Sequence, residues 1–387
     1  MKNKHIPEIR FSDFQDDWEQ RKLGELATFS KGSGYTKNDL IEKGTPIVLY
    51  GRLYTNYQTV INDVDTFVEE KPKSVVSDGN EVVVPASGET SEDISRASVI
   101  GKSGLILGGD LNIIKPYKII DSTFLALTIS NGTQQKEMSK RAQGKSVVHL
   151  HNSDLKQVNL LYPKLEEQQK IGSFFQQLDD TIALHQRKLN QQQELKKAML
   201  QKMFLKNGEK QPELRFSGFT EDWEQRKLGD IYNFQYGQFN NNPDNGGEYP
   251  VYGANGIIGG YHEYNAEDSV VIGHMGAYAG HVLWASGKHF VTYNGTIGFP
   301  KIKEFDKKFG YHMLQHLNIP KITAGSGQPF VSYADLENIN ISLPINLEEQ
   351  QKIGSFFKQL DETIALRQRE LDALKGTKKA FLQKMFI

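Results

Sequence analysis

The stretch LEEQQKIGSFFQQLDDTIALHQRKL, beginning at Leu165, returns almost unchanged as LEEQQKIGSFFKQLDETIALRQREL, beginning at Leu347. Between residues 165–204 and 347–386, 29 of 40 positions are identical. Within each copy, apolar residues recur at alternating steps of four and three, which is the pattern of a coiled-coil seam. A proline shortly before each copy marks the end of extended chain. The sequence therefore predicts two long, equivalent helices.

The predicted seam is apolar at most of its positions. These positions are Ile171, Phe175, Leu178, Ile182 and Leu189 in the first copy, and Ile353, Phe357, Leu360, Ile364 and Leu371 in the second. Polar residues at His185/Arg367 and Lys196/Lys378 interrupt the seam, and such residues can fix the register of two helices. Each helix has an alternative, packing on its own domain or on another protein, but two near-identical seams favour packing on each other. Further apolar residues remain for an outside partner: Phe174, Phe356, Leu200 and Leu382.

A second repeat precedes each helix. EIRFSDFQDDWEQRKLGE, Glu8 to Glu25, matches ELRFSGFTEDWEQRKLGD, Glu213 to Asp230, at 13 of 18 positions. The segments between the repeats, 28–160 and 234–343, do not resemble each other. We therefore predict four parts: an N-terminal domain (1–160), a first helix (161–205), a C-terminal domain (206–343) and a second helix (344–387).

Both variable segments contain short β-branched runs separated by Gly, Asn and Asp turns, which indicates mostly β domains. Residues 121–131 and 305–317 are the best helix candidates within them. Each segment ends in a similar phrase, a Gly-rich turn, an apolar pair, then Asp-Leu and an alternating strand, with Asp154–Leu155 corresponding to Asp335–Leu336. The predicted fold class is α+β: two mostly β domains related by a pseudo-two-fold axis and separated by two long antiparallel helices forming an intramolecular coiled coil.

Composition narrows the function. The net charge is −1, so a nucleic-acid-binding role must rest on local arrangement rather than on bulk basicity. The absence of cysteine excludes disulfides and fits a reducing cytoplasm. Neither a signal-like apolar run nor a stretch long enough to span a membrane is present, so we expect a cytoplasmic protein with no membrane partner.

Motifs for catalysis are missing. GKS occurs twice, but Arg96 and Ser139 stand where a P-loop needs glycine. The histidines are scattered without the spacing of metal ligands, and no Ser lies in a GxSxG context. We therefore expect no catalytic residues, metal or cofactor in this chain, and a role in binding.

The WEQRKLG block, the LEEQQKIGxFF run after a proline, and the order variable segment, helix, variable segment, helix resemble the specificity subunit of type I restriction-modification systems. The resemblance covers essentially the whole chain. It implies that each variable segment is a target recognition domain reading one half of a bipartite, asymmetric double-stranded DNA sequence, and that the helices set the spacer. It also implies assembly with two adenine-N6 methyltransferase (modification) subunits and two ATP-dependent restriction subunits. S-adenosylmethionine, ATP and Mg²⁺ are then expected on those partners.

The resemblance does not identify the base-contacting residues, so we choose them by chemistry. Arg and Lys suit guanine, Asn and Gln suit adenine, Ser can also reach base edges, and turns with Gly allow close backbone approach. The DNA-binding candidates of the N-terminal domain are Lys31, Ser33, Tyr35, Arg52, Tyr54, Ser87, Arg96, Lys145 and Ser146. Those of the C-terminal domain are Tyr236, Gln238, Asn255, His274, Tyr293, Asn294 and Gln328. The alternative function is a protein–protein adaptor with two β domains on a coiled coil.

Overall fold

The structure is a computed structural model that describes residues 6–142, 147–206, 208–240, 242–322 and 329–387. The chain forms two compact units, Met1–Gln186 with Glu370–Ile387, and Arg187–Arg369. The four-part division predicted from the repeat follows the helices, whereas each compact unit takes part of both long helices. No helix in the described residues is long and apolar enough to cross a bilayer.

The N-terminal unit is built on a five-stranded sheet. Its strands, in spatial order, are β2 (Ala27–Lys31), β11 (Leu111–Pro116), β7 (Val82–Pro85), β9 (Ser98–Ile100) and β5 (Val60–Ile61). A four-stranded sheet follows the order β10 (Ile106–Leu107), β4 (Thr45–Val48), β6 (Phe67–Val68) and β3 (Leu40–Ile41). Two pairs complete the strands: β1 (Glu19–Lys22) with β13 (Asn159–Tyr162), and β8 (Ser87–Gly88) with β12 (Val148–His149).

Short helices join these strands. They are η1 (Leu23–Glu25), η2 (Lys37–Asp39), α1 (Arg52–Thr55), α2 (Ser91–Ile94), α3 (Ser122–Ile129), α4 (Gly132–Arg141) and α5 (Asn152–Lys156). The predicted helix over residues 121–131 is confirmed as α3. It begins after Asp121, whose carboxylate accepts a hydrogen bond from the backbone N–H of Phe124 at 2.9 Å. The buried residues of α3, including Phe124 and Leu125, belong to the main core of this unit.

The C-terminal unit has one six-stranded sheet and one strand pair. The sheet order is β15 (Tyr232–Tyr236), β20 (Gly295–Pro300), β18 (Ala266–Gly273), β19 (Val282–Val291), β16 (Tyr249–Gly253) and β17 (Gly256–Tyr261). The pair joins β14 (Glu224–Lys227) to β21 (Asn340–Leu343), and the shorter helices are α7 (Leu228–Ile231), η3 (Gly276–Tyr278), α8 (Lys307–His316), η4 (Ile319–Ile322) and α9 (Tyr333–Glu337). The predicted helix over 305–317 is confirmed as α8, capped by Asp306.

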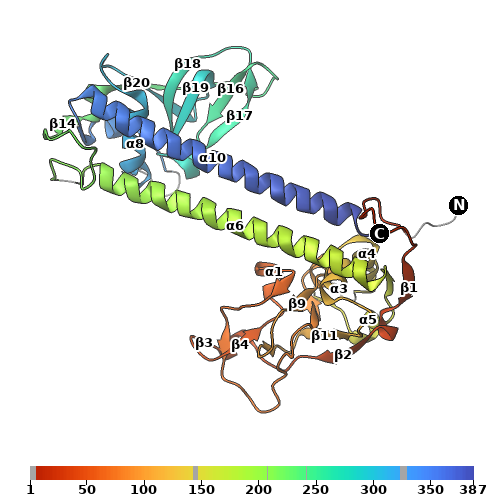
Figure 1. Ribbon diagram of the computed structural model, residues 1–387. Coiled ribbons are helices and arrows are strands. Elements are labelled where there is room, and N and C mark those ends of the chain that lie inside the picture. Colours follow the sequence, from red (N-terminus) through yellow and green to blue (C-terminus); the bar gives the residue numbers. More distant parts are fainter. Residues whose placement is uncertain (1–5, 143–146, 207, 241, 323–328) are drawn as a thin grey trace. The chain divides into compact units, whose positions relative to one another are not determined.

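The two long helices are α6 (Leu165–Met203) and α10 (Leu347–Lys384). They are continuous in Figure 1, which confirms the predicted pair of long helices. In the N-terminal unit, Lys378 of α10 pairs with Asp179 of α6, and Lys375 Nζ donates to Gln186 Oε1 at 3.3 Å. The residue numbers rise along one helix as they fall along the other, so the helices pack antiparallel.

The same contact recurs in the C-terminal unit. There Lys196 Nζ lies 2.6 Å from Asp361 Oδ1. In the helix repeat, Lys196 and Asp361 occupy the positions of Lys378 and Asp179. Of the polar positions predicted in the seam, Lys196 and Lys378 therefore each form an ion pair within their own unit.

The seam residues divide into two groups. Six are buried and four, Leu178, Ile182, Leu360 and Ile364, are half-buried. Ile171 and Phe175 lie in the core of the N-terminal unit, and Ile353 and Phe357 in the core of the C-terminal unit. The first turns of each helix thus pack on their own domain, so the alternative weighed for the sequence holds for that part of each helix.

Each core also receives the end of the other long helix. Met385 and Phe386 join the N-terminal core, while Met203 and Phe204 join the C-terminal core. The predicted outside-facing residues Phe174, Phe356, Leu200 and Leu382 are half-buried against these cores, with Phe174 in edge-to-face contact with Phe381. Part of each side chain is thus covered by the protein's own cores, and binding of an outside partner by the exposed part stays a prediction.

The LEEQQ motif anchors each helix to its domain. Glu167 accepts two hydrogen bonds from Arg10, both at 2.7 Å, and Glu349 accepts two from Arg215, at 2.7 and 2.8 Å. Gln168 is buried, bonds the carbonyls of Pro163 and Ile119 and accepts from the N–H of Asp121; Gln350 does the same toward Pro344 and Asp306. The repeated segments of the sequence therefore have a structural role, and we call them the frame.

Candidate nucleic-acid interface

One edge of each domain has the same backbone design. In the N-terminal domain, Gly32 N–H donates to Leu111 O at 3.1 Å, Ala86 N–H to Asp110 O at 2.8 Å, and Leu150 N–H to Ala86 O at 3.0 Å. In the C-terminal domain the corresponding bonds are Gly237 N–H to Gly295 O (2.9 Å), His274 N–H to Asn294 O (2.8 Å), and Val331 N–H to His274 O (2.9 Å). Isolated bridges also correspond, Ser33 with Gly108 and Gln238 with Thr292.

We call this feature the matched edge. It comprises residues 31–33, 86–88, 108–110 and 149–151 in the N-terminal domain, and 236–238, 274–276, 292–294 and 330–332 in the C-terminal domain. Both versions require glycine at one crossing. A Cβ on Gly32 would lie 1.9 Å from Gly108 O, and one on Gly237 would lie 2.1 Å from Thr292 O. Two unrelated sequences therefore share one backbone frame that brings four chain segments together.

Three predicted residues lie on the matched edge of the N-terminal domain. Lys31 ends β2; partial burial lowers its pKa, and the nearby Asp110 carboxylate opposes that shift. Ser33 supports the fold, because its hydroxyl donates to Leu107 O at 3.3 Å and accepts from the N–H of Val75 at 3.1 Å. Ser87 pairs with His149 across β8 and β12.

Tyr54 touches this edge from α1. Its hydroxyl donates to the carbonyl of Ser87, and burial raises the pKa of the phenol. Arg96 follows α2 and lies 3.9 Å from Asp93, with 39% of its side chain exposed. Exposure leaves that guanidinium able to reach a ligand.

Two other predicted residues are engaged inside the domain. Tyr35 is buried, and its hydroxyl bonds Ser74 and accepts from the N–H of Lys71. Arg52 donates to Asp65 Oδ1 and Gln58 Oε1, both at 2.9 Å. Both side chains therefore stabilise the fold of the domain. Lys145 and Ser146, also predicted, fall outside the described residues.

The matched edge of the C-terminal domain gathers most of its predicted residues. Tyr236, Gln238, His274, Tyr293 and Asn294 come from three segments. The ring of Tyr236 lies 4.2 Å from that of His274, and His274 Nδ1 donates to Val331 O at 3.0 Å. Because a carbonyl oxygen only accepts, this bond leaves His274 Nε2 available to a ligand.

Other residues at this edge were missed by the sequence predictions. Tyr333 stacks on Tyr236 at 4.0 Å, and its hydroxyl accepts from the Tyr236 N–H. Phe330 bridges to Met275. The similar closing phrases of the two variable segments were the signal that could have found them. With Asp154 placed opposite Asp335, Phe330 aligns with His149 and Tyr333 aligns with Asn152. His149 and Asn152 were also overlooked.

The two remaining C-terminal predictions lie elsewhere. Asn255 sits in the turn between β16 and β17, next to Ala254, whose carbonyl lies 3.1 Å from where a Cβ on Gly273 would be. The turn therefore approaches the end of β18. Gln328 is outside the described residues.

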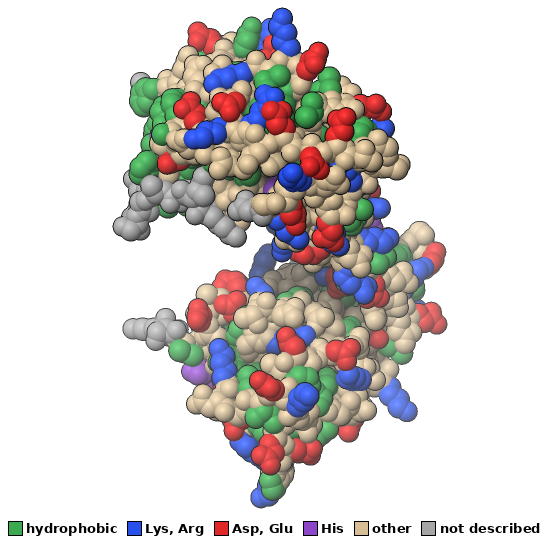
Figure 2. All heavy atoms as spheres, turned by 90° about the vertical axis from the view of Figure 1, so that its left-hand side faces the viewer, with side chains coloured by type: hydrophobic (Ala, Val, Ile, Leu, Met, Phe, Trp, Pro, Cys, Tyr) green, Lys and Arg blue, Asp and Glu red, His purple; other side chains and the backbone are tan. Residues whose placement is uncertain are grey.

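Charge does not gather by sign on the face of the domains that Figure 2 shows. Lys and Arg side chains are interspersed with Asp and Glu on the face seen in Figure 2. Segment 28–160 carries 15 basic and 15 acidic residues, and segment 234–343 carries 6 and 9. Neither domain has the basic excess from which strong phosphate binding arises.

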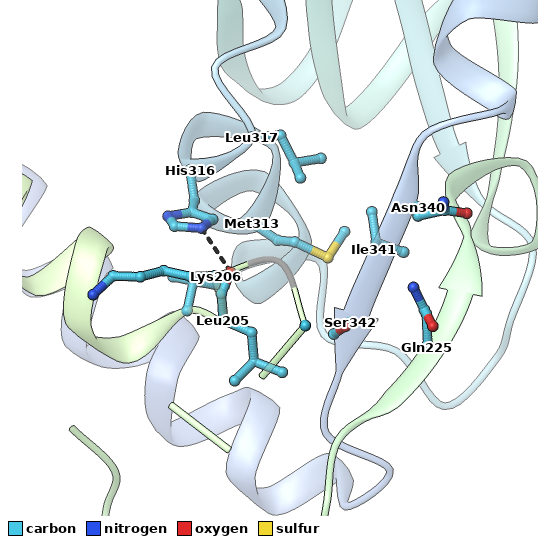
Figure 3. Close-up of a pocket in the computed structure, with 11 residues that line it drawn as sticks. Leu205, Lys206, Gln225, Met313, His316, Leu317, Asn340, Ile341 and Ser342 are labelled. Atoms are coloured by element: carbon cyan, nitrogen blue, oxygen red, sulfur yellow. Dashed lines mark hydrogen bonds between the residues drawn. The ribbon is translucent and has the colours of Figure 1, made fainter. Parts of the chain in front are cut away.

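A cavity of about 260 Å³ lies in the C-terminal unit between the end of α6, α8 and the β14–β21 pair (Figure 3). His316 Nε2 lies 3.2 Å from Leu205 O, and burial lowers the pKa of the imidazole. Ser342 is in the lining, but the imidazole is directed at the carbonyl instead. The described lining therefore offers no nucleophile–base pair, and in the described part of the chain no cluster of three His, Asp or Glu is placed to hold a metal ion.

A neutral histidine supports the helix contact of the C-terminal unit. Burial, with the nearby Lys196 charge, lowers the pKa of His312 to about 3. Its Nε2 lies 3.8 Å from Asp361 Oδ2, but a neutral imidazole makes no ion pair there. The Asp361 charge is therefore balanced by Lys196, and His312 fills space beside the pair.

The family model "Type I restriction modification DNA specificity domain" matches residues 15–194 and 220–376. These two matches cover most of the chain, so the protein belongs to the DNA specificity subunits of type I restriction-modification systems. The MjaVIII type I restriction enzyme specificity subunit of Methanocaldococcus jannaschii is 22% identical over 423 aligned positions, covering 98% of this chain and 95% of the relative. A putative MjaX specificity subunit of the same organism is 23% identical over 414 positions, with the same coverage.

Solved structures show the same fold. The S subunit of the type I restriction-modification system of M. genitalium aligns with a TM-score of 0.73 at 19% identity, covering 99% of both chains. A chain from a study of complex assembly and conformational transition of the type I system aligns with a TM-score of 0.54 at 18% identity, covering 94% of this chain and 96% of the other. The predicted family and α+β fold are thereby confirmed.

Proposed function

We propose that each domain reads one half of a bipartite, asymmetric DNA target through its matched edge. The observation that carries this proposal is the pairing of one backbone frame with two different sets of side chains. A frame that is kept while its surface groups differ suits two docking events of equal geometry and unequal specificity. Pseudo-two-fold readers dock on half-sites in equivalent poses.

The long helices hold the two readers and set the spacer between half-sites. Because α6 and α10 are near-identical, they offer two copies of one surface, which suits two copies of one modification subunit. The chain itself then performs no catalysis. Adenine-N6 methylation with S-adenosylmethionine, and cleavage with ATP and Mg²⁺, belong to two modification and two restriction subunits in the cytoplasm.

Because the charges of the two domains are balanced, we assign part of the phosphate binding to the partner subunits. Phosphate contacts dominate affinity and release counterions, so their number sets the salt dependence of binding. We expect the isolated chain to bind DNA weakly, with a shallow salt dependence, and the complex with modification subunits to bind tightly with a steep one. Tight and steeply salt-dependent binding by the isolated chain would contradict this division.

Sequencing of N6-methyladenine in cells with and without this chain tests the function. One gapped motif should lose methylation in the deletion strain and regain it when the chain is restored. Restoring a chain with Gln238→Ala and Asn294→Ala should leave the motif altered or unmethylated, because both amides lie on the matched edge. An unchanged methylation pattern in the deletion strain would contradict the proposal and favour the adaptor function.

A further inference from the structure

Exposed aromatic rings cover the matched edge of the C-terminal domain. Phe239 is 71% exposed and its ring lies 5.7 Å from that of Tyr293, which is 44% exposed. Tyr236 belongs to a second aromatic group at this edge, with its ring stacked on Tyr333 and 4.2 Å from that of His274. We call these five residues the aromatic strip. Exposed aromatic side chains that gather at one edge in this way mark an interaction site.

Backbone hydrogen bonds position the strip. Tyr293 N–H donates to Gln238 O at 3.1 Å, and Gln238 N–H donates to Val291 O at 2.9 Å. Tyr236 and His274 are tied to Tyr333 and Val331 as described above. The segments carrying the rings are therefore ordered before a ligand arrives, which lowers the entropic cost of binding.

The residues that define the C-terminal matched edge include neither Lys nor Arg. The sequence has no arginine between Arg226 and Arg367, and no lysine is among the residues of the strip or of the C-terminal matched edge. Lysines of this domain with described contacts are engaged elsewhere: Lys288 over Tyr264, Lys301 on Gly229 O, Lys307 on Asp268 O and Lys308 over Trp284. Arg and Lys make the commonest specific contacts with guanine. This edge instead offers aromatic rings and the amides of Gln238 and Asn294.

The N-terminal matched edge has different chemistry. Lys31 and Asp110 are among the residues that define it. A lysine suits guanine O6 and N7, and a carboxylate accepts from cytosine N4. The two edges therefore differ in the base pairs they suit.

Resting on the proposed function, we infer that the C-terminal domain reads A·T pairs: Phe239 and Tyr293 contact thymine methyl groups in the major groove, and Gln238 and Asn294 bond adenine. Apolar side chains recognise the thymine C5-methyl, and amides make paired hydrogen bonds to adenine N6 and N7. The half-site of the C-terminal domain is then A·T at its contacted positions. The half-site of the N-terminal domain includes G·C.

Deoxyuridine tests the inference because it removes the methyl group and leaves base pairing intact. The complex of this chain with its modification subunits is titrated with its mapped target, with one thymine replaced at a time. The half-site read by the C-terminal domain is the one that changes when segment 234–343 is exchanged. There we expect about a fourfold loss of affinity for each contacted methyl, and little loss in the other half-site.

Variants connect the methyl effect to the strip. Phe239→Ala should weaken binding to the thymine duplex and abolish the penalty at one deoxyuridine position. The matched control is Tyr264→Ala, an aromatic residue that is 46% exposed and packs on Tyr249 at the start of β16, away from the edge. This control should keep the full penalty.

Three results would overturn the inference: a C-terminal half-site of G·C pairs, no deoxyuridine penalty there, or a penalty that Phe239→Ala leaves unchanged. Each of them leaves the proposed function standing, because the complex would still recognise a gapped motif. A complex that binds all duplexes equally would instead overturn the proposed function.

Discussion

The two domains solve one structural problem with different surfaces. Both hold a Gly crossing, equivalent backbone hydrogen bonds at the matched edge, and an Arg–Glu anchor to a long helix. At the edge, however, one presents Lys31, Ser87 and Asp110, while the other presents Tyr236, His274 and Tyr293. The difference shows that the frame and the reader are separable. Changes to the frame should affect stability, and changes to the edge should affect the specificity of one domain.

Removal of the helix-end phenylalanines should have the largest effect on stability. Phe386 packs with Phe124 and Phe175 in the N-terminal core, and Phe204 packs with Phe309 and Phe357 in the C-terminal core. Phe386→Ala and Phe204→Ala should each cost about 3–5 kcal/mol. Hydrogen exchange should show Phe386→Ala loosening the N-terminal core and Phe204→Ala the C-terminal core. The opposite assignment would break the comparison.

The Arg–Glu anchors come next. Glu349 is 1% exposed, so Arg215→Ala leaves a buried carboxylate without its main partner. We expect a loss of about 3 kcal/mol, near the lower end for breaking a buried pair, in thermal unfolding. Arg10→Ala is the matched variant, and it should cost more, because Trp223 Nε1 also donates to Glu349 at 3.3 Å and no such tryptophan bond to Glu167 is found in the described structure. Equal losses would show that the tryptophan bond contributes little.

A glycine pair separates the domains more finely. A Cβ on Gly354 would lie 2.4 Å from Asp306 Oδ1 and 2.8 Å from the N of Phe309, whereas one on Gly172 would meet Asp121 Oδ1 at 3.1 Å. Gly354→Ala should therefore lower the free energy of unfolding by about 1–2 kcal/mol from overpacking. Gly172→Ala should be close to neutral, because the gain in helix propensity of about 1 kcal/mol offsets the tighter contact. Denaturant titration of both variants distinguishes them, and a larger loss at Gly172 would contradict the geometry.

The helix ion pairs should have the smallest effect. Lys196→Met and Lys378→Met each remove one partly exposed pair, and each should cost about 1 kcal/mol or less. A double-mutant cycle of Lys196→Met with Asp361→Asn isolates the coupling. Lys378→Met with Asp179→Asn is the matched cycle, and the two coupling energies should agree. Unequal coupling energies would show that the two ion pairs contribute differently to stability.

The frame could be predicted from the sequence because its segments occur twice in the chain. The period of the LEEQQ repeat predicts α6 and α10. Periodicity does not reveal that Phe204 enters the core of the C-terminal unit and that Phe386 enters the core of the N-terminal unit. That depends on tertiary packing.

The edge was harder to predict because it is made by pairing of distant segments. Chemistry alone selected Tyr35 and Arg52 along with Lys31, although hydrogen bonds inside the domain occupy the first two. The C-terminal predictions met more often at one place, since Gly-flanked Tyr, Asn and Gln there mark the strand ends. Tyr333 and Phe239 were overlooked because the residues they contact at the edge, Tyr236 and Tyr293, lie far away in the sequence, and no motif marks either contact.

Exchange of one variable segment tests the central claim most directly. Segment 28–160 is replaced by the corresponding segment of another specificity subunit, and N6-methyladenine is sequenced in cells carrying the chimera with its partner subunits. We predict that one half of the methylated motif changes, while the other half and the spacer stay the same. A chimera that alters both half-sites together, or neither, would contradict the separation of frame and reader.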